Sequence, residues 1–317
     1  MRVYQHSGAV PLSGAAMALA AGALASAALG IVYSFSFYYI PYVYLNFALA
    51  AGFGAASGWV VGFCAKEGKL RNVAAVAVLA VVATLVGIYA EWGSTVYAMV
   101  PFEDLPRLWA RAGISTFHPL AIAHAMHTLF EQGSWGLSAN VNVTGWPLVA
   151  LWLAETGLVL MASFAAAVHH IDKHPFCEAC DEWVSGHAPH FYVGDGTEPV
   201  WSEVKHGVFE TLALTPRAAG TEPTFVRLTL KSCNGCLASN FLTIAACHNV
   251  VDSRGNKRFQ ETDLVTNLVI ESSQLEIIEA ANLIAPAPGE TLLEPSPPSG
   301  EWTLQSTPQP TDSNSLV

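Results

Sequence analysis

The order of hydrophobic and polar positions changes near residue 170. Before that point, long apolar runs alternate with short polar stretches, and after it apolar residues are spaced among polar and acidic ones. A run of about 20 apolar residues is long enough for a helix to cross the hydrocarbon core of a bilayer. The pattern predicts an α-helical membrane bundle over residues 1–170, followed by a small α+β soluble domain over residues 171–284.

Four apolar runs predict four transmembrane helices. They cover Ser13–Val32, Tyr42–Ala65, Val73–Ala90 and Trp146–Val168. The first run is too long for a cleaved signal peptide, and a second apolar run follows almost at once, so both are interpreted as membrane spans. With four spans, both ends of the chain lie on the same side of the membrane.

The basic residues beside these runs predict the orientation. Two lie in the connection between the third and fourth runs, Arg107 and Arg111, whereas five lie on the opposite side: Arg2, Lys66, Lys69, Arg71 and Lys173. Short loops rich in Lys and Arg stay in the cytoplasm. We therefore expect an integral protein of the cell (inner) membrane, with cytoplasmic N- and C-termini.

Small residues recur at every fourth position in the first two runs. The first series is Gly14, Ala18, Gly22, Ser26 and Gly30, and the second is Gly54, Gly58 and Gly62. Such series let helix backbones approach closely in lipid, where close packing replaces the hydrophobic effect. We expect them to pack the chain's own helices together, in preference to forming a contact between copies.

The connection between the third and fourth runs, about residues 101–145, predicts an extracytoplasmic amphipathic segment. Residues 102–113 and 119–133 both have helical spacing. In the second stretch, His124, His127 and Glu131 share a face. They are weak candidates for binding a metal or relaying protons, and the simpler interpretation is a solvated polar face.

Glu155 is the candidate polar group inside the membrane. It lies nine residues beyond Trp146, about 13 Å along a helix and close to the bilayer midplane. A charged carboxylate there is unfavourable, so Glu155 must be protonated, paired or facing water. It is either part of a proton or ion relay, or a structural carboxyl bonded to a neighbouring polar group such as Asn46, Ser57 or Thr84. Glu91 is expected near an interface, which leaves Glu155 without a second intramembrane charge.

Four of the six cysteines form two Cys-x-x-Cys pairs, Cys177 with Cys180 and Cys233 with Cys236. Two such pairs supply the four thiolates of a tetrahedral structural Zn²⁺ site, and a reducing cytoplasm favours metal over disulfides. The 52 residues between the pairs exceed the usual zinc-ribbon spacing. Free thiols remain an alternative, as does a thiol oxidoreductase. Cys64 and Cys247 are expected to be free.

The elements predicted after residue 170 suit a zinc-ribbon-like domain of three or four strands. A helix is expected over about residues 198–214, strands over residues 224–230, 240–251 and 263–272, and a closing helix over residues 272–284. Residues 285–317 are rich in Pro and Ser and predict a disordered tail.

Composition limits the function. Residues 169–290 contain sixteen acidic and eight basic residues, which argues against nucleic-acid binding. Because no complete catalytic set is recognisable, we do not expect an enzyme. The sequence favours a membrane scaffold or accessory subunit, whose zinc-stabilised domain contacts other membrane subunits or a second copy. A proton- or ion-coupled transporter or channel component using Glu155 is the first alternative, and a thiol oxidoreductase the second.

Overall fold

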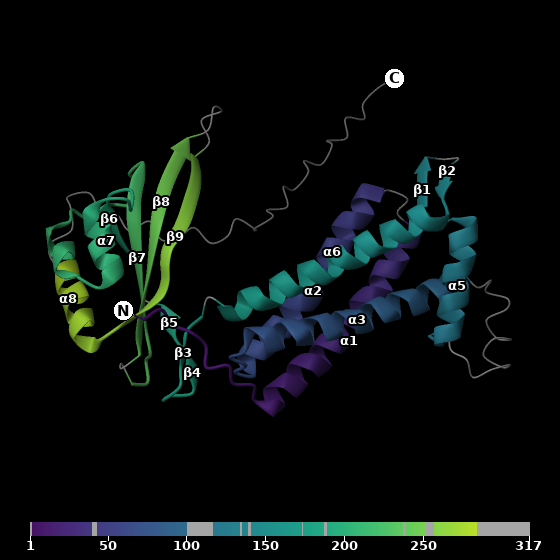
Figure 1. Cartoon of the computed structure of the whole chain (residues 1–317), viewed down its shortest axis with the longest axis horizontal. Helices are drawn as coiled ribbons and strands as arrows, with labels where there is room; N and C mark the ends of the chain where they lie inside the picture. Colours follow the sequence, from purple (N-terminus) through teal and green to yellow (C-terminus); the bar gives the residue numbers. More distant parts are fainter. Residues whose placement is uncertain are drawn as a thin grey trace, which may run out of the picture.

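The computed structural model describes residues 2–39, 43–99, 117–133, 135–138, 141–172, 174–186, 189–236, 239–251 and 257–283. Two parts lie end to end (Figure 1). One is a helical bundle, and the other is a mixed domain built on an antiparallel sheet, called the sheet domain below.

Four helices form the bundle: α1 (Leu12–Tyr39), α2 (Val43–Glu67), α3 (Val73–Met99) and α6 (Gly145–Asp172). All four are long and apolar enough to cross a membrane. Each is longer than the apolar run that predicted it, because helical hydrogen bonding continues past the apolar residues. The extension of α3 corrects the expected position of Glu91, which lies within an apolar span and not beyond its end.

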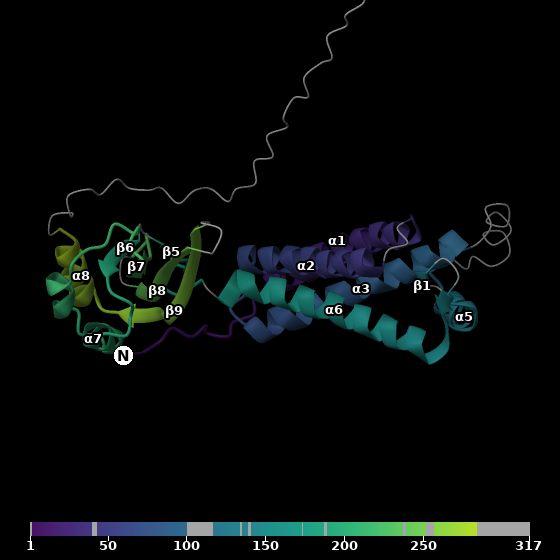
Figure 2. The same ribbon diagram turned by 90° about the horizontal axis from the view of Figure 1, so that it is seen from above.

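The four helices of the bundle lie side by side (Figure 2). The most extensive contacts are those of α1 with α3 and of α2 with α6, and α1 also packs against α2. The series of small residues lies in these contacts. A Cβ atom on Gly54, Gly58 or Gly62 would collide with the α6 backbone, at Val159, Ser163 and Ala167 respectively. On α1, Gly30 lies equally close to the backbone of Gly87 in α3. The series therefore serves close packing inside the chain's own bundle.

The far end of the bundle carries α5 (Pro119–Gln132) and a short hairpin of β1 (Trp135–Ser138) and β2 (Val141–Val143). Ile122 and Ala125 of α5 are buried against Trp92 and Val96 of α3. Helix α5 is thus the amphipathic helix predicted over residues 119–133. The helix predicted over residues 102–113 lies outside the described residues.

The sheet domain begins with two short hairpin strands, β3 (Phe176–Cys177) and β4 (Glu182–Trp183). An antiparallel sheet of five strands follows, comprising β5 (Ser185–Gly186), β6 (His190–Val193), β7 (Thr224–Ser232), β8 (Asn240–Val251) and β9 (Lys257–Ile270). Strands β7, β8 and β9 are consecutive neighbours, and both β5 and β6 pair with β7. The sheet is larger than the three or four strands expected, because two short segments between the cysteine pairs join it.

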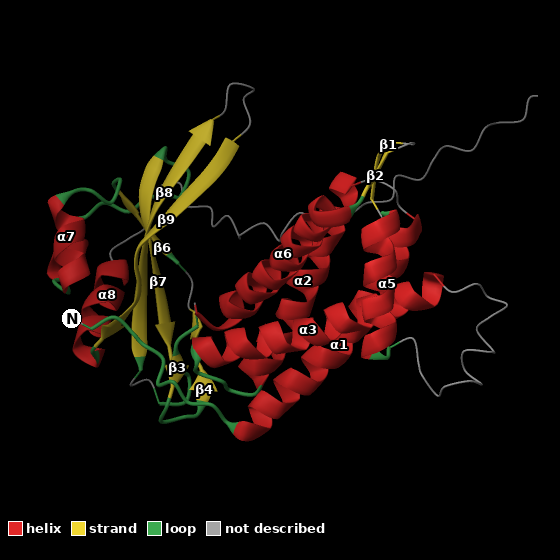
Figure 3. Cartoon of the chain, turned by 45° about the vertical axis from the view of Figure 1, so that its right-hand side comes forward, coloured by secondary structure: helices red, strands yellow, loops and turns green. Residues whose placement is uncertain are grey.

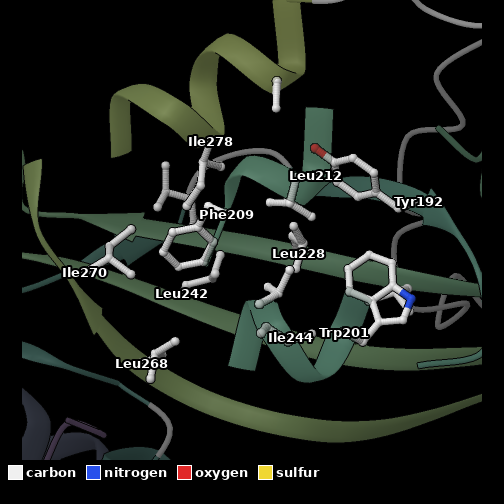
Figure 4. Packing of buried hydrophobic residues seen from close by; sticks show 14 residues of the cluster. Tyr192, Trp201, Phe209, Leu212, Leu228, Leu242, Ile244, Leu268, Ile270 and Ile278 are labelled. Carbon is white, nitrogen blue, oxygen red and sulfur yellow. The ribbon is translucent and has the colours of Figure 1, made fainter. Parts of the chain in front are cut away.

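Helices α7 (Pro199–His206) and α8 (Ser272–Leu283) and the 3₁₀ helix η1 (Glu210–Leu214) lie on one face of the sheet (Figure 3). The core between these layers contains Trp201, Phe209, Leu228, Ile244 and Ile278 (Figure 4). The prediction of a single helix over residues 198–214 was wrong. Gly207 has a φ of 90°, a left-handed conformation that ends α7, and the chain resumes as η1.

The first residues of the chain belong to the sheet domain. Val3 forms an antiparallel bridge with Leu268 of β9, and the Tyr4 N–H donates to the Asn267 carbonyl at 2.9 Å. The chain then runs to the start of α1 (Figure 1). The sheet domain is therefore connected to the bundle at both α1 and α6. The tail predicted over residues 285–317 lies outside the described residues.

Substitution of Gly58 by Ala tests the α2–α6 contact. Its Cβ would meet backbone atoms of Ser163 that cannot move independently. We expect Gly58→Ala to lower the free energy of unfolding by about 1–3 kcal/mol, the usual cost of overpacking. Gly52→Ala on the same helix is the matched control, because nothing lies within 4 Å of its added Cβ. Thermal unfolding of both variants in detergent measures the difference, and equal melting temperatures would contradict the packing role.

Candidate metal centre

The four paired cysteines are carried by two turns of the sheet domain. Cys177 ends β3 and Cys180 lies in the turn to β4, while Cys233 follows β7 and Cys236 lies in the turn before β8. Strand β5 brings the two turns together, because it follows β4 directly and pairs with the end of β7. The long sequence between the pairs is thereby used to build α7, η1 and β7 without separating the turns.

The four Sγ atoms lie within 4.8 Å of one another, and those of Cys177 and Cys236 are 3.6 Å apart. Zn–S bonds of about 2.3 Å in a tetrahedron place sulfur atoms about 3.8 Å apart, so the group fits a metal of this size. Cys177 and Cys233 are buried, whereas Cys236 is exposed. In the part of the chain that the structure describes, no second group of three or more His, Cys or acidic residues brings its ligand atoms close enough together to hold a metal ion.

Two further side chains contact the thiols. Ser239 Oγ lies 3.3 Å from Cys177 Sγ. Glu182 Oε1 accepts hydrogen bonds from Cys233 Sγ at 3.1 Å and from the Gly235 N–H at 3.2 Å. Such contacts orient metal ligands and set their basicity. Sequence reasoning missed both residues. Their only signal was proximity, since each lies two or three positions after a Cys-x-x-Cys pair.

The surroundings lower the pKa of one thiol of the cluster and raise the pKa of two others. Burial alone would raise the pKa of Cys177, but hydrogen bonds from Ser239, the Cys180 backbone and the neighbouring thiols outweigh it and lower the pKa to about 6. Hydrogen bonds with Cys236 and Cys233 raise the pKa of Cys180. Burial raises the pKa of Cys233, and its bond to Glu182 acts in the same direction. A metal ion would therefore bind the Cys177 thiolate and displace protons from Cys180 and Cys233.

The first turn is attached to the bundle through the loop between α2 and α3. Lys69 Nζ lies 2.6 Å from Asp181, and Arg71 pairs with Glu178. The Trp183 indole N–H donates to the Lys66 carbonyl at 2.7 Å. A metal ion bound by both turns would consequently join the sheet to a turn that already contacts the bundle.

The weaker candidates on α5 do not form a comparable site. His124, His127 and Glu131 are all exposed. His127 Nδ1 lies 3.8 Å from Glu131 Oε1, one helical turn away. This arrangement matches a solvated polar face of the helix.

Glu155 has a partner that the sequence did not suggest. The Tyr33 hydroxyl donates to Glu155 Oε1, and the Tyr33 side chain is buried inside the bundle. Thr84, proposed as a partner of Glu155, instead bonds Ser163 at 2.7 Å. Glu91 lies within electrostatic range of Glu155, which corrects the expectation that Glu155 has no second charge nearby.

Fold and site together define a class: a bundle of four helices able to cross a membrane, followed by a small sheet domain with a four-cysteine cluster able to hold a metal ion. Comparison of the chain with known protein families, curated proteins and solved structures found no match in any of the three. Function must therefore be argued from the site itself.

Removing a thiol tests the metal centre. We expect the wild-type protein to contain one metal ion per chain, and Cys177→Ser and Cys236→Ser to contain less than about a tenth of that amount, because three thiols cannot complete a closed site. Cys64→Ser is the matched control, since Cys64 lies in α2 outside the cluster. Elemental analysis of the purified variants measures the metal. Full metal content in Cys236→Ser would contradict four-cysteine coordination.

Substitution of Ser239 tests the outer contact. Because the Ser239 hydroxyl stabilises the Cys177 thiolate, Ser239→Ala should weaken metal affinity by about tenfold or more. Competition with a chromogenic chelator measures the affinity. Ser202→Ala, in an exposed position on α7, serves as the control and should leave it unchanged. Equal affinities of the wild type and Ser239→Ala would show that the contact has no role in ligation.

Proposed function

We propose that this protein is an integral membrane scaffold or accessory subunit, whose metal-stabilised sheet domain contacts other proteins of a membrane assembly. The observation that carries the proposal is the position of the four-cysteine cluster. It joins the sheet to the turn that contacts the α2–α3 loop, so metal binding would fix the sheet domain relative to the bundle. A scaffold must hold its interaction domain in a fixed orientation relative to its membrane part.

Zinc is the metal that the cluster fits best. Four thiolates are soft ligands in a tetrahedral arrangement, which favours Zn²⁺ among abundant divalent ions. A structural zinc ion needs only four thiolates in this arrangement, which the two turns supply. We therefore assign a structural zinc ion to the cluster and a zinc-ribbon-like architecture to the sheet domain.

The surface of the sheet domain supports protein contacts. Val193, Val208, Val250 and Phe259 are large apolar side chains that stay exposed. The acidic excess of this domain is the reverse of a nucleic-acid binding surface. The natural partner is another subunit of the membrane assembly or a second copy of this chain.

The same features support a cytoplasmic position for the sheet domain. The N-terminal residues and the segment after α6 both belong to the sheet domain, at one end of the bundle. That end also carries Lys66, Lys69 and Arg71, as expected of a cytoplasmic loop. We place the sheet domain in the cytoplasm, at the inner membrane, where a reducing environment keeps the four thiols available for metal.

A second candidate function is proton or ion handling in the bundle. The contact of Tyr33 with Glu155, and the proximity of Glu91, place two carboxyl groups and a phenol inside apolar helices. Ionisable residues in such positions often mark a pathway. Proton flux into liposomes that disappears in Glu155→Gln would establish this function, whereas equal flux in the wild type and variant would exclude it.

Native mass spectrometry tests the scaffold function. The protein is extracted gently from its own membrane, and we expect one zinc per chain within a complex containing further subunits. Cys177→Ser should lose both the metal and these subunits, since the sheet domain would no longer be fixed. Cys64→Ser should retain both. A metal-free monomer, or a complex that persists without metal in Cys177→Ser, would contradict the proposal.

A further inference from the structure

Cys236 is the solvent-exposed thiol of the four-cysteine cluster. Cys177 and Cys233 are buried, and Cys180 is half-buried. A dissolved peroxide oxidises a thiolate only where it can reach the sulfur atom. Exposure therefore selects Cys236 as the first of the four to react with an oxidant arriving from solvent.

A second thiol lies directly behind Cys236. Cys177 Sγ lies 3.6 Å from Cys236 Sγ, although the two cysteines belong to different turns. Cys177 is buried in an apolar cluster with Val184 and Phe241, which shields it from solvent. An oxidised cysteine condenses with a neighbouring thiol to form a disulfide. Cys177 is thus placed to react with Cys236 after Cys236 has been oxidised.

This pair differs from the two Cys-x-x-Cys pairs in what a disulfide would connect. A disulfide inside either Cys-x-x-Cys pair closes one turn and leaves the two turns unconnected. A disulfide of Cys177 with Cys236 joins the β3–β4 turn to the turn between β7 and β8, as a bound metal would. Figure 3 shows the β3–β4 hairpin at the junction of the sheet and the bundle. Such a disulfide would therefore preserve this connection after the metal has left.

We propose that the cluster is a peroxide-sensitive site, in which oxidation replaces the metal ion by a disulfide between Cys177 and Cys236. In the first step, the Cys236 thiolate attacks one oxygen of hydrogen peroxide. The O–O bond breaks, hydroxide leaves, and Cys236 becomes a sulfenic acid. The proposal concerns the regulation of the metal centre, so it rests on the structural zinc assigned under the proposed function.

The second step forms the disulfide. The Cys177 thiolate attacks Cys236 Sγ, the S–O bond breaks, and a second hydroxide leaves and is protonated to water. The two sulfur atoms together lose two electrons, and the peroxide gains them. The metal ion dissociates because two of its four thiolate ligands have been consumed.

Peroxide treatment of the full-length, zinc-loaded protein in detergent tests the proposal. A chromogenic chelator measures released zinc. Free thiols are then alkylated, the chain is digested, and disulfide-linked peptides are identified by mass spectrometry. At the lowest peroxide dose that releases zinc, we expect Cys177 linked to Cys236 as the main product. Any other main product, such as a disulfide inside a Cys-x-x-Cys pair, would overturn the proposal.

Two histidine substitutions separate the roles of the cysteines. Three cysteines and one histidine also hold structural zinc, so Cys236→His and Cys180→His each keep four ligands. Cys236→His removes the exposed thiol, and peroxide should release its zinc about tenfold more slowly or less. Cys180→His is the matched control, because it keeps Cys177 and Cys236 and should release zinc at the wild-type rate. Equal release rates in the two variants would refute the role of Cys236.

The same measurements distinguish failure of this proposal from failure of the proposed function. A wild-type protein isolated without zinc would contradict the structural zinc, yet peptide mapping of that protein still shows whether peroxide joins Cys177 to Cys236. A zinc-containing complex in which peroxide forms no such disulfide would refute the peroxide-sensitive site and leave the scaffold function intact.

Discussion

The gathering of four thiols between two hairpin turns is the constraint on which the arrangement of the molecule depends. One turn contacts Lys66 at the end of α2 and Lys69 and Arg71 of the α2–α3 loop. The other turn connects the central strands β7 and β8. Surface ion pairs such as Lys69 with Asp181 contribute little to stability by themselves, because water and salt screen them. Coordination of a metal by both turns would add a connection whose bonds do not weaken with salt, alongside the pairing of the N-terminal residues with β9.

The bundle obeys a different constraint, because lipid provides no hydrophobic effect between helices. Backbone contact replaces it: Gly54, Gly58 and Gly62 bring α2 against the backbone of α6, and Gly30 brings α1 against α3. Polar side chains in this setting find partners inside the protein, as Thr84 does with Ser163 and Tyr33 with Glu155. The same close packing that stabilises the bundle thus holds the Glu155 carboxyl among apolar helices in a defined environment.

The N-terminal residues pair with strand β9, and this pairing connects the sheet domain to the start of α1. The bridge of Val3 to Leu268 places the N-terminus beside β9. Because α1 starts only a few residues later, the sheet domain cannot rotate freely about the exit of α6.

The sequence by itself determined the features that depend on local pattern. Apolar runs of sufficient length predicted the four spanning helices, small residues at every fourth position predicted contact faces, and the two Cys-x-x-Cys pairs predicted the ligands that the structure brings together. These signals were sufficient because each depends on neighbours within a few positions. Tertiary structure decided the rest: that Glu91 lies near Glu155, that Glu182 and Ser239 contact the thiols, that Gly207 divides a helix, and that the N-terminus joins β9. These features depend on contacts between residues far apart in the chain, and no local pattern records which distant segments will meet.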